Sequence, residues 1–156
     1  MLYRAKFKDY PDGGVTIAQV HNRGGAGRPL LRVEIKEGEI EFVITDTHVK
    51  GAGETHEVAG PDYIENTYLD LLFEVGNDQI RATVVTTSGS KTVTYTRNNS
   101  NDDFNISNTW YQSGVSNSNN GISLDEGFYF KAGVYNDTGD GSNEPVGTFA
   151  SFIYEE

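Results

Sequence analysis

The stretch FYFKAGVYND, residues 128–137, holds four aromatic and two aliphatic residues among its ten positions. Alternate residues of a β-strand point to opposite faces of its sheet. The even positions are all apolar: Phe128, Phe130, Ala132 and Val134. The odd positions are two tyrosines, a lysine and a glycine: Tyr129, Tyr135, Lys131 and Gly133. We therefore predict a strand that buries one face in a core and presents phenols and an ammonium group on the other.

Similar runs rich in Val, Ile, Thr, Tyr and Phe recur along the chain, separated by Gly, Asn, Asp and Ser. The pattern predicts strands near residues 3–8, 15–21, 30–35, 39–45, 69–75, 79–86, 92–96, 127–135 and 146–154. The turn sequences PDGG (11–14), KEGE (36–39) and VGNDQ (75–79) support three of the connections. Helical periodicity is not sustained, and GPDYIENTYLDLL is the one candidate for a single helical turn. We predict one all-β domain, residues 1–156, built as a two-sheet antiparallel sandwich or jelly roll.

The balance of charge limits the partners that the chain can have. It carries 12 basic and 23 acidic residues, for a formal net charge of −11. Nucleic-acid binding needs clustered Lys and Arg, so we expect no nucleic-acid partner. Arg23, Arg28 and Arg32 nevertheless fall within ten residues. This local patch suits a polyanionic substrate, although ordinary surface arginines on a loop are an equally weighted alternative.

Cysteine and membrane signals are both lacking in this sequence. Without cysteine there is no disulfide framework and no thiolate metal site. No apolar run approaches the length of a membrane span, and MLYRAKFKDY lacks the apolar segment of a secretory signal. We therefore expect a soluble chain with no membrane partner.

A second stretch, TIAQVHN (16–22), carries the other candidates for chemistry. Strict alternation places Ile17, Gln19 and His21 on one face of this strand. It places Thr16, Ala18 and Val20 on the other face. An amide and an imidazole side by side break the binary pattern of a buried strand, and such breaks are expected at functional sites. Beside the polar face of 128–137, they would form a polar cleft.

Other polar segments carry weaker signals. The long stretch 97–121 contains Trp110 beside Tyr111, which could stack on a sugar ring or simply anchor the segment to the core. His48 and His56 lie among several carboxylates, but their spacing is not a ligand pattern that we recognise, so we predict no metal site. The stretch NDTGDGSNE (136–144) lacks the ordered ligands of a calcium loop and is predicted to be a solvated turn.

The motifs QVH and YFKAGVYN together resemble the paired motifs of the alginate lyases of polysaccharide lyase family 7. GTFASFIYEE is also similar to the family's last strand, and YRAKFKDYPDGGVTIAQVH resembles its approach to the Gln-x-His strand. The likeness is colinear from about residue 3 to the end. It implies a concanavalin-like jelly roll with a concave substrate cleft, and a secreted or periplasmic protein.

The sequence differs from the family pattern at the N-terminal end. Family members carry an Arg-x-Glu-Leu-Arg strand upstream of Gln-x-His, and one of its arginines neutralises the substrate carboxylate. That motif is missing here, so either the chain lacks the front of the domain, or another residue or another chain supplies the strand. Missing strands would leave ladder edges and an apolar face exposed, so we predict a homodimer or larger assembly that covers them.

The resemblance implies β-elimination on alginate, an acidic polysaccharide, without a metal or organic cofactor. Gln19 would bond to the uronate carboxylate, His21 would act as a base or second neutraliser, and Tyr135 as the acid at the leaving oxygen. The implied substrate-binding residues are Lys131, Tyr129, Asn136, Arg28 and Arg32. The middle residue of Gln-x-His, Val20, is associated in the family with polymannuronate.

Two other functions fit the same residues. One is a non-catalytic jelly-roll module that grips an acidic polysaccharide through Arg23, Arg28, Arg32 and Lys131. The other is a lyase that acts on another uronan, such as glucuronan. Loss of turnover but not of binding in Tyr135→Phe would distinguish the enzyme from the binding module.

Overall fold

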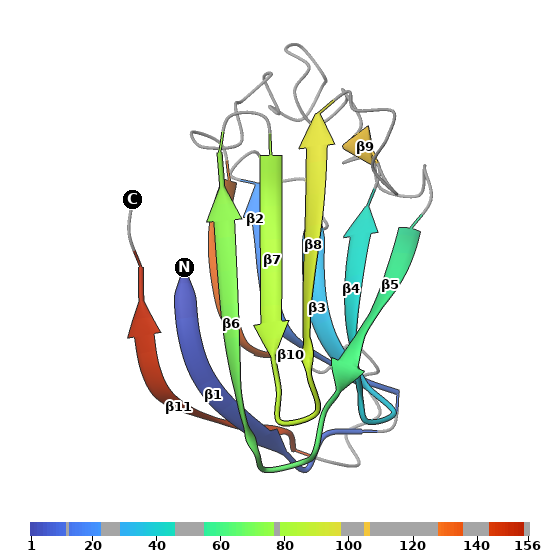
Figure 1. Cartoon of the computed structure of the whole chain (residues 1–156). Coiled ribbons are helices and arrows are strands. Elements are labelled where there is room, and N and C mark those ends of the chain that lie inside the picture. The colour runs from blue at the N-terminus through green and yellow to red at the C-terminus, as the bar shows by residue number, and fades with distance from the viewer. Residues whose placement is uncertain are drawn as a thin grey trace.

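The computed structural model describes residues 1–11, 13–22, 29–45, 55–76, 79–97, 105–106, 128–135 and 144–154. These residues form a six-stranded and a five-stranded sheet and contain no helix long and apolar enough to cross a membrane. The six-stranded sheet has the order β11 (Val146–Ile153), β1 (Leu2–Lys8), β6 (Tyr68–Val75), β7 (Gln79–Val85), β8 (Ser90–Arg97) and β9 (Asn105–Ile106). The five-stranded sheet has the order β10 (Phe128–Tyr135), β2 (Val15–Asn22), β3 (Leu31–Lys36), β4 (Glu39–Thr45) and β5 (Thr55–Asp62). All pairings are antiparallel except that of β8 with β9 (Figure 1).

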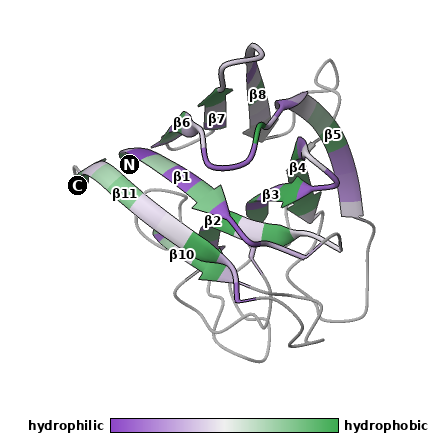
Figure 2. Cartoon of the chain, turned by 90° about the horizontal axis from the view of Figure 1, so that it is seen from below, coloured by the Kyte–Doolittle hydropathy of each residue, from purple (hydrophilic) through white to green (hydrophobic). Residues whose placement is uncertain are grey.

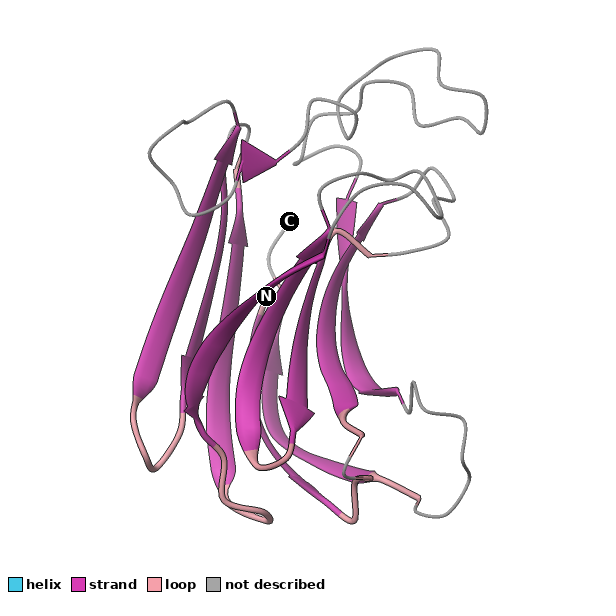
Figure 3. Ribbon diagram, turned by 90° about the vertical axis from the view of Figure 1, so that its right-hand side faces the viewer, coloured by secondary structure: helices cyan, strands magenta, loops and turns pink. Residues whose placement is uncertain are grey.

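The two sheets face each other as layers, with the core between them (Figure 3). Alternation along β3 and β7 buries every second side chain, as the period of a strand requires. Phe73 of β6 stacks on Phe130 of β10 with ring centroids 5.7 Å apart, which joins the layers directly. The predicted two-sheet antiparallel sandwich is confirmed.

Each predicted strand is found, but β5 and β9 were not predicted. β5 contains Gly60 and Pro61, which are rare within strands. These two residues are tolerated because β5 is the edge strand of its sheet and pairs with β4 alone. The one candidate for a helical turn is not helical, since GPD ends β5 and a turn around Glu65 and Asn66 leads directly into β6. β9 lies within the long polar stretch 97–121, where no strand was predicted.

The KEGE turn closes a tight hairpin between β3 and β4. Lys36 pairs with Glu39, and the two residues between them have positive φ, 51° at Glu37 and 81° at Gly38. Such a two-residue turn matches the twist of the strands on either side. The register of β4 on β3 is therefore fixed locally.

An irregularity in β2 overturns one prediction about its faces. Thr16 pairs with Glu34 and Ala18 with Val33, so Ile17 is one extra residue in β2. This bulge carries Ile17 into the core, where it is fully buried, and brings Thr16 to the outward face that Glu34 shares. The prediction from strict alternation is thus wrong for Thr16 and Ile17, and it holds for Gln19 and Val20.

Tyr63, between β5 and β6, ties three parts of the fold together. Its hydroxyl accepts a hydrogen bond from the Phe7 amide at 2.7 Å and lies 2.9 Å from the Thr67 carbonyl, which can take its proton. Its own amide donates to the Gly38 carbonyl at 2.7 Å. Burial raises the pKa of Tyr63 to about 12. The phenol is therefore held neutral against β1 of one sheet, and the backbone amide of the same residue binds the hairpin turn of the other.

The edge strands β10 and β11 of the two sheets lie on the same flank of the sandwich (Figure 2), where Val134 of β10 approaches Gly147 of β11. Ala5 pairs with Phe149 and Tyr3 with Phe152, so both phenylalanines share the inward face of β1. They remain 40% and 51% exposed, although they contact the buried ring of Tyr3. The expected homo-oligomer would cover such a flank, and it stays a prediction.

We expect Tyr63→Phe to lower the free energy of unfolding by about 1–3 kcal/mol, because the buried Phe7 amide loses its acceptor. The folded-state pKa is raised, so the stability contribution of this phenol is complete below pH 10 and is lost as pH rises towards 12. Urea unfolding from pH 8 to pH 11 should therefore show a shallower loss of stability in the variant. A variant with unchanged stability would contradict the role given to Tyr63.

We expect Ile17→Ala to cost about 2–5 kcal/mol of unfolding free energy, because the bulge places a fully buried side chain in the core. Chemical denaturation measures the loss, with Ile64→Ala as the control, since Ile64 is exposed outside the strands. Equal stability of the two variants would mean that Ile17 lies outward, as strict alternation predicts.

Candidate active site

The outward face of the five-stranded sheet collects the predicted site residues in rows that run across β10, β2 and β3. Tyr129 stands opposite His21. One pleat along, Gln19 stands opposite Lys131 on one side and Arg32 on the other. Directly paired residues have Cβ atoms about 5 Å apart, so these side chains are neighbours. The two sequence motifs therefore form one polar surface, as predicted.

The inward face of the same strands holds this surface in place. Phe130, Ala132 and Val134 pack against the core, and Val20 of β2 is fully buried there. These apolar contacts fix which face of β10 looks outward, because a slip by one residue would bury Lys131. The predicted division of β10 into an apolar and a polar face is confirmed.

A carboxylate that the sequence did not single out organises the β3 side of the surface. Glu34 Oε1 lies 2.8 Å from Arg32 Nε and accepts a hydrogen bond from Thr16 Oγ1 at 3.2 Å. The Arg32 N–H does not point straight at the oxygen, so the contact is an ion pair rather than an aligned hydrogen bond. Thr16 and Glu34 were missed because a threonine in a strand and a glutamate beside an arginine are ordinary in sequence.

The β10 side of the surface is built around an aromatic ring. Tyr129 lies against the His21 ring, with centroids 5.5 Å apart and planes tilted by 33°. The Lys131 ammonium lies 5.4 Å from the centre of the same Tyr129 ring, within the range of a cation–π contact. Imidazole, phenol and ammonium therefore form one connected group.

Tyr135 occupies the next row, opposite Thr16. Its side chain is 43% exposed, and its Cε2 lies 3.6 Å from where a Cβ on Gly133 would stand. The ring thus leans back along β10 over the glycine, towards the row of Lys131 and Gln19. His21 lies on the other side of Gln19 along β2, so the amide is flanked by imidazole and phenol from opposite directions.

Several predicted site residues cannot be placed. Asn136, Arg23, Arg28, Trp110 and His48 lie outside the described residues. His56 is on β5, opposite Ile44, and among the described residues no group of His, Asp and Glu could hold a metal ion. The concave cleft over the polar face stays a prediction.

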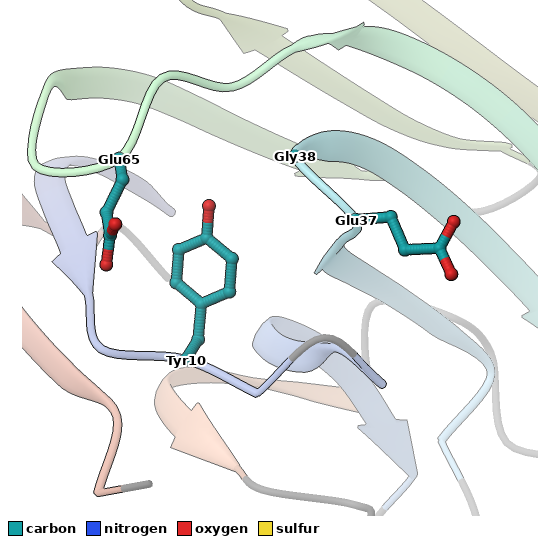
Figure 4. Close-up of a pocket in the computed structure, with 4 residues that line it drawn as sticks. All are labelled: Tyr10, Glu37, Gly38 and Glu65. Atoms are coloured by element: carbon teal, nitrogen blue, oxygen red, sulfur yellow. The ribbon is translucent and has the colours of Figure 1, made fainter.

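A cavity of about 500 Å³ lies elsewhere, where the β1–β2, β3–β4 and β5–β6 connections meet, lined by Tyr10, Glu37, Gly38 and Glu65. In Figure 4 the ring of Tyr10 stands between Glu65 and Gly38, and the carboxylate of Glu37 points away from it. Burial and then the charge of Glu65 raise the pKa of Tyr10. An acidic lining repels a polyanion, so the outward face of β10, β2 and β3 is the better candidate site.

Comparison with solved structures identifies the architecture. Alginate lyase A1-II′, a member of polysaccharide lyase family-7, matches with a TM-score of 0.61 and 15% identity over 97% of this chain and 61% of that one. An alginate lyase from Klebsiella pneumoniae matches with a TM-score of 0.58 and 13% identity, over 96% of this chain and 59% of that one. The predicted jelly roll is confirmed, and this chain spans about three fifths of the length of each enzyme.

Comparison of the sequence itself gives the family. No curated protein sequence matches the chain. A family model described as "Alginate lyase" matches residues 1–155, nearly the full length. This match confirms the family that the QVH and YFKAGVYN motifs indicated, and the chain therefore belongs to the alginate lyase family.

Proposed function

We propose that this chain is a lyase that cleaves 4-linked uronate polymers, alginate in the first place, by β-elimination. One observation carries the proposal in a chain of this family. Lys131, Gln19 and Arg32 stand in direct register across three strands, so a neutral donor lies between two cations. A row of this kind suits a carboxylate that must be both bound and activated.

The reaction requires that activation. The base removes the hydrogen on C5, α to the carboxylate, the C4–O bond breaks, and a C4=C5 double bond forms. While the carboxylate keeps its full charge, the C5 hydrogen is very weakly acidic. Donors on the carboxylate therefore lower the barrier, because they stabilise the charge that develops on it. We assign this task to Gln19, which lies on the outward face of β2 with 8% of its surface exposed.

Tyr135 is the residue that we assign to the leaving oxygen. Its ring leans over Gly133 towards the Gln19 row, which brings the phenol beside a sugar whose carboxylate rests on Gln19. In mannuronate, the C5 hydrogen and the leaving oxygen lie on the same side of the ring. One phenol can therefore take the C5 proton and deliver a proton to the oxygen.

His21 and Tyr129 complete the site from the other side of Gln19. The imidazole lies one pleat from the amide on the same face, and the Tyr129 ring packs against it. We assign His21 to the carboxylate as a second donor, or to C5 as the base when the proton lies on the opposite side of the sugar. Tyr129 shapes the surface, and Lys131 attracts the polyanion.

We propose polymannuronate as the preferred polymer. The lean of Tyr135 towards the Gln19 row supports this choice, because one phenol can serve as both base and acid in same-side elimination. Val20, which the family associates with polymannuronate, is fully buried and so cannot touch a sugar. Its influence would have to act through the packing of β2.

We expect Tyr135→Phe to lower kcat by about 100- to 10,000-fold while binding of the polymer is retained, because the substitution removes the proton donor alone. Ultraviolet absorbance of the new double bond measures turnover on polymannuronate, polyguluronate and glucuronan separately. Tyr154→Phe is the matched control, since both phenols are 43% exposed and Tyr154 lies at the end of the other sheet.

The same assay separates the three functions. A signal with one polymer that disappears in Tyr135→Phe but not in Tyr154→Phe supports the lyase and names its substrate. A flat trace with every polymer, together with measurable binding of alginate, would show a non-catalytic binding module. An absorbance increase with glucuronan alone would show that the chain is a lyase that acts on glucuronan rather than on alginate.

A further inference from the structure

A neutral amide cannot by itself balance the charge of the proposed reaction. When the C5–H pair of electrons moves into the carboxylate, the group becomes an enolate-like dianion, and the charge stays there until C4–O breaks. A positive charge aimed at the carboxylate would stabilise this species more than the ground state. We propose that Arg32 supplies this charge, and that Glu34 is the residue that positions Arg32; both assignments rest on the proposed lyase function.

Register places Arg32 next to the bound carboxylate. Arg32 is the direct cross-strand partner of Gln19, so its side chain rises from the strand adjacent to the amide on the same face. A planar guanidinium can meet a carboxylate with two parallel N–H groups, whereas an ammonium acts as a point charge. The arginine is thus the better matched of the two cations that flank Gln19.

Glu34 holds the guanidinium from its place two residues along β3 on the same face, and Thr16 in turn holds Glu34. Glu34 Oε1 lies 2.8 Å from Arg32 Nε, and the same oxygen accepts the Thr16 hydroxyl at 3.2 Å. The Glu34 side chain is only 15% exposed and Thr16 is fully buried, so the anchor is largely shielded from water. Glu34 contacts Nε, and we assign the terminal nitrogens of the same guanidinium to the substrate carboxylate.

Lys131 is oriented differently. Its ammonium lies 5.4 Å from the centre of the Tyr129 ring, which stands in the row of His21 rather than in that of Gln19. It is therefore directed along the face, where it can attract the polymer over more than one sugar. The two cations therefore have different roles: Lys131 raises the affinity for the polyanion, and Arg32 stabilises the enolate-like dianion of the transition state.

Steady-state kinetics of the full chain on the polymer that the wild type cleaves tests the proposal. We expect Arg32→Ala to lower kcat by about 100-fold with a much smaller change in KM, because the charge matters most in the transition state. Arg32→Lys should give an intermediate kcat, since it keeps the charge but loses the planar fork. Added guanidinium should partly restore Arg32→Ala, whereas the same concentration of sodium chloride should not.

Arg81→Ala is the matched control. Arg81 forms an ion pair with Glu74, at 3.2 Å, on the exposed face of the other sheet, where both side chains are more exposed than those of Arg32 and Glu34. Its loss should leave kcat within about twofold of the wild type. A fall of similar size in both variants would show that lost ion pairs act through stability, and would overturn the assignment of Arg32.

Glu34 is tested through its dependence on Arg32. Glu34→Gln should lower kcat in the wild-type background and have no further effect in Arg32→Ala, because it acts only through the guanidinium. Additive losses in the double variant would overturn the positioning role. An unchanged kcat in Arg32→Ala, or a rise in KM alone, would overturn the role of Arg32 and leave the lyase standing, whereas an inactive wild type would overturn both.

Discussion

The candidate site depends on the antiparallel pairing of β10 with β2. This ladder decides which side chains of the two motifs stand opposite each other, Lys131 to Gln19 and Tyr129 to His21. β10 is an edge strand, so among the described strands it has one neighbour in its sheet. Its orientation therefore relies on the apolar side chains beneath, above all on the stacking of Phe130 on Phe73. The chemistry of the outward face is set by the packing of the inward one.

Charge on this protein acts locally. The chain as a whole is strongly acidic, with a net charge of −11, yet the proposed substrate is itself a polyanion. Exposed charges separated by more than about 8 Å are largely screened at physiological salt, so distant carboxylates repel a substrate at the site only weakly. What a bound sugar meets is the row of Lys131, Gln19 and Arg32. Glu34 belongs to this surface too, but its oxygen is already engaged by Arg32 and Thr16.

Much of this arrangement was predictable from sequence, because alternation and turn chemistry are local. The polar face of β10 and the pairing of Gln19 with His21 on one face follow from a period of two residues. The parts that were missed depend on tertiary contacts. β5 tolerates Gly60 and Pro61 because it lies at an edge, and the bulge at Ile17 becomes visible only against the regular strand β3. Register across strands likewise cannot be read from one chain segment, so the partnership of Gln19 with Arg32 came from the structure.

The bulge in β2 limits how such a site can diverge. Substitutions on the outward face change one side chain and leave the rest in place. A deletion or insertion elsewhere in β2, by contrast, would shift the residues on one side of it against β3 by one position, and deletion of Ile17 itself would keep Thr16 opposite Glu34 but remove a fully buried side chain from the core. Length changes within β2 are therefore far more disruptive than exchanges of residues. Descendants of this chain would be expected to vary in the chemistry of the face while keeping the number of residues in that strand constant.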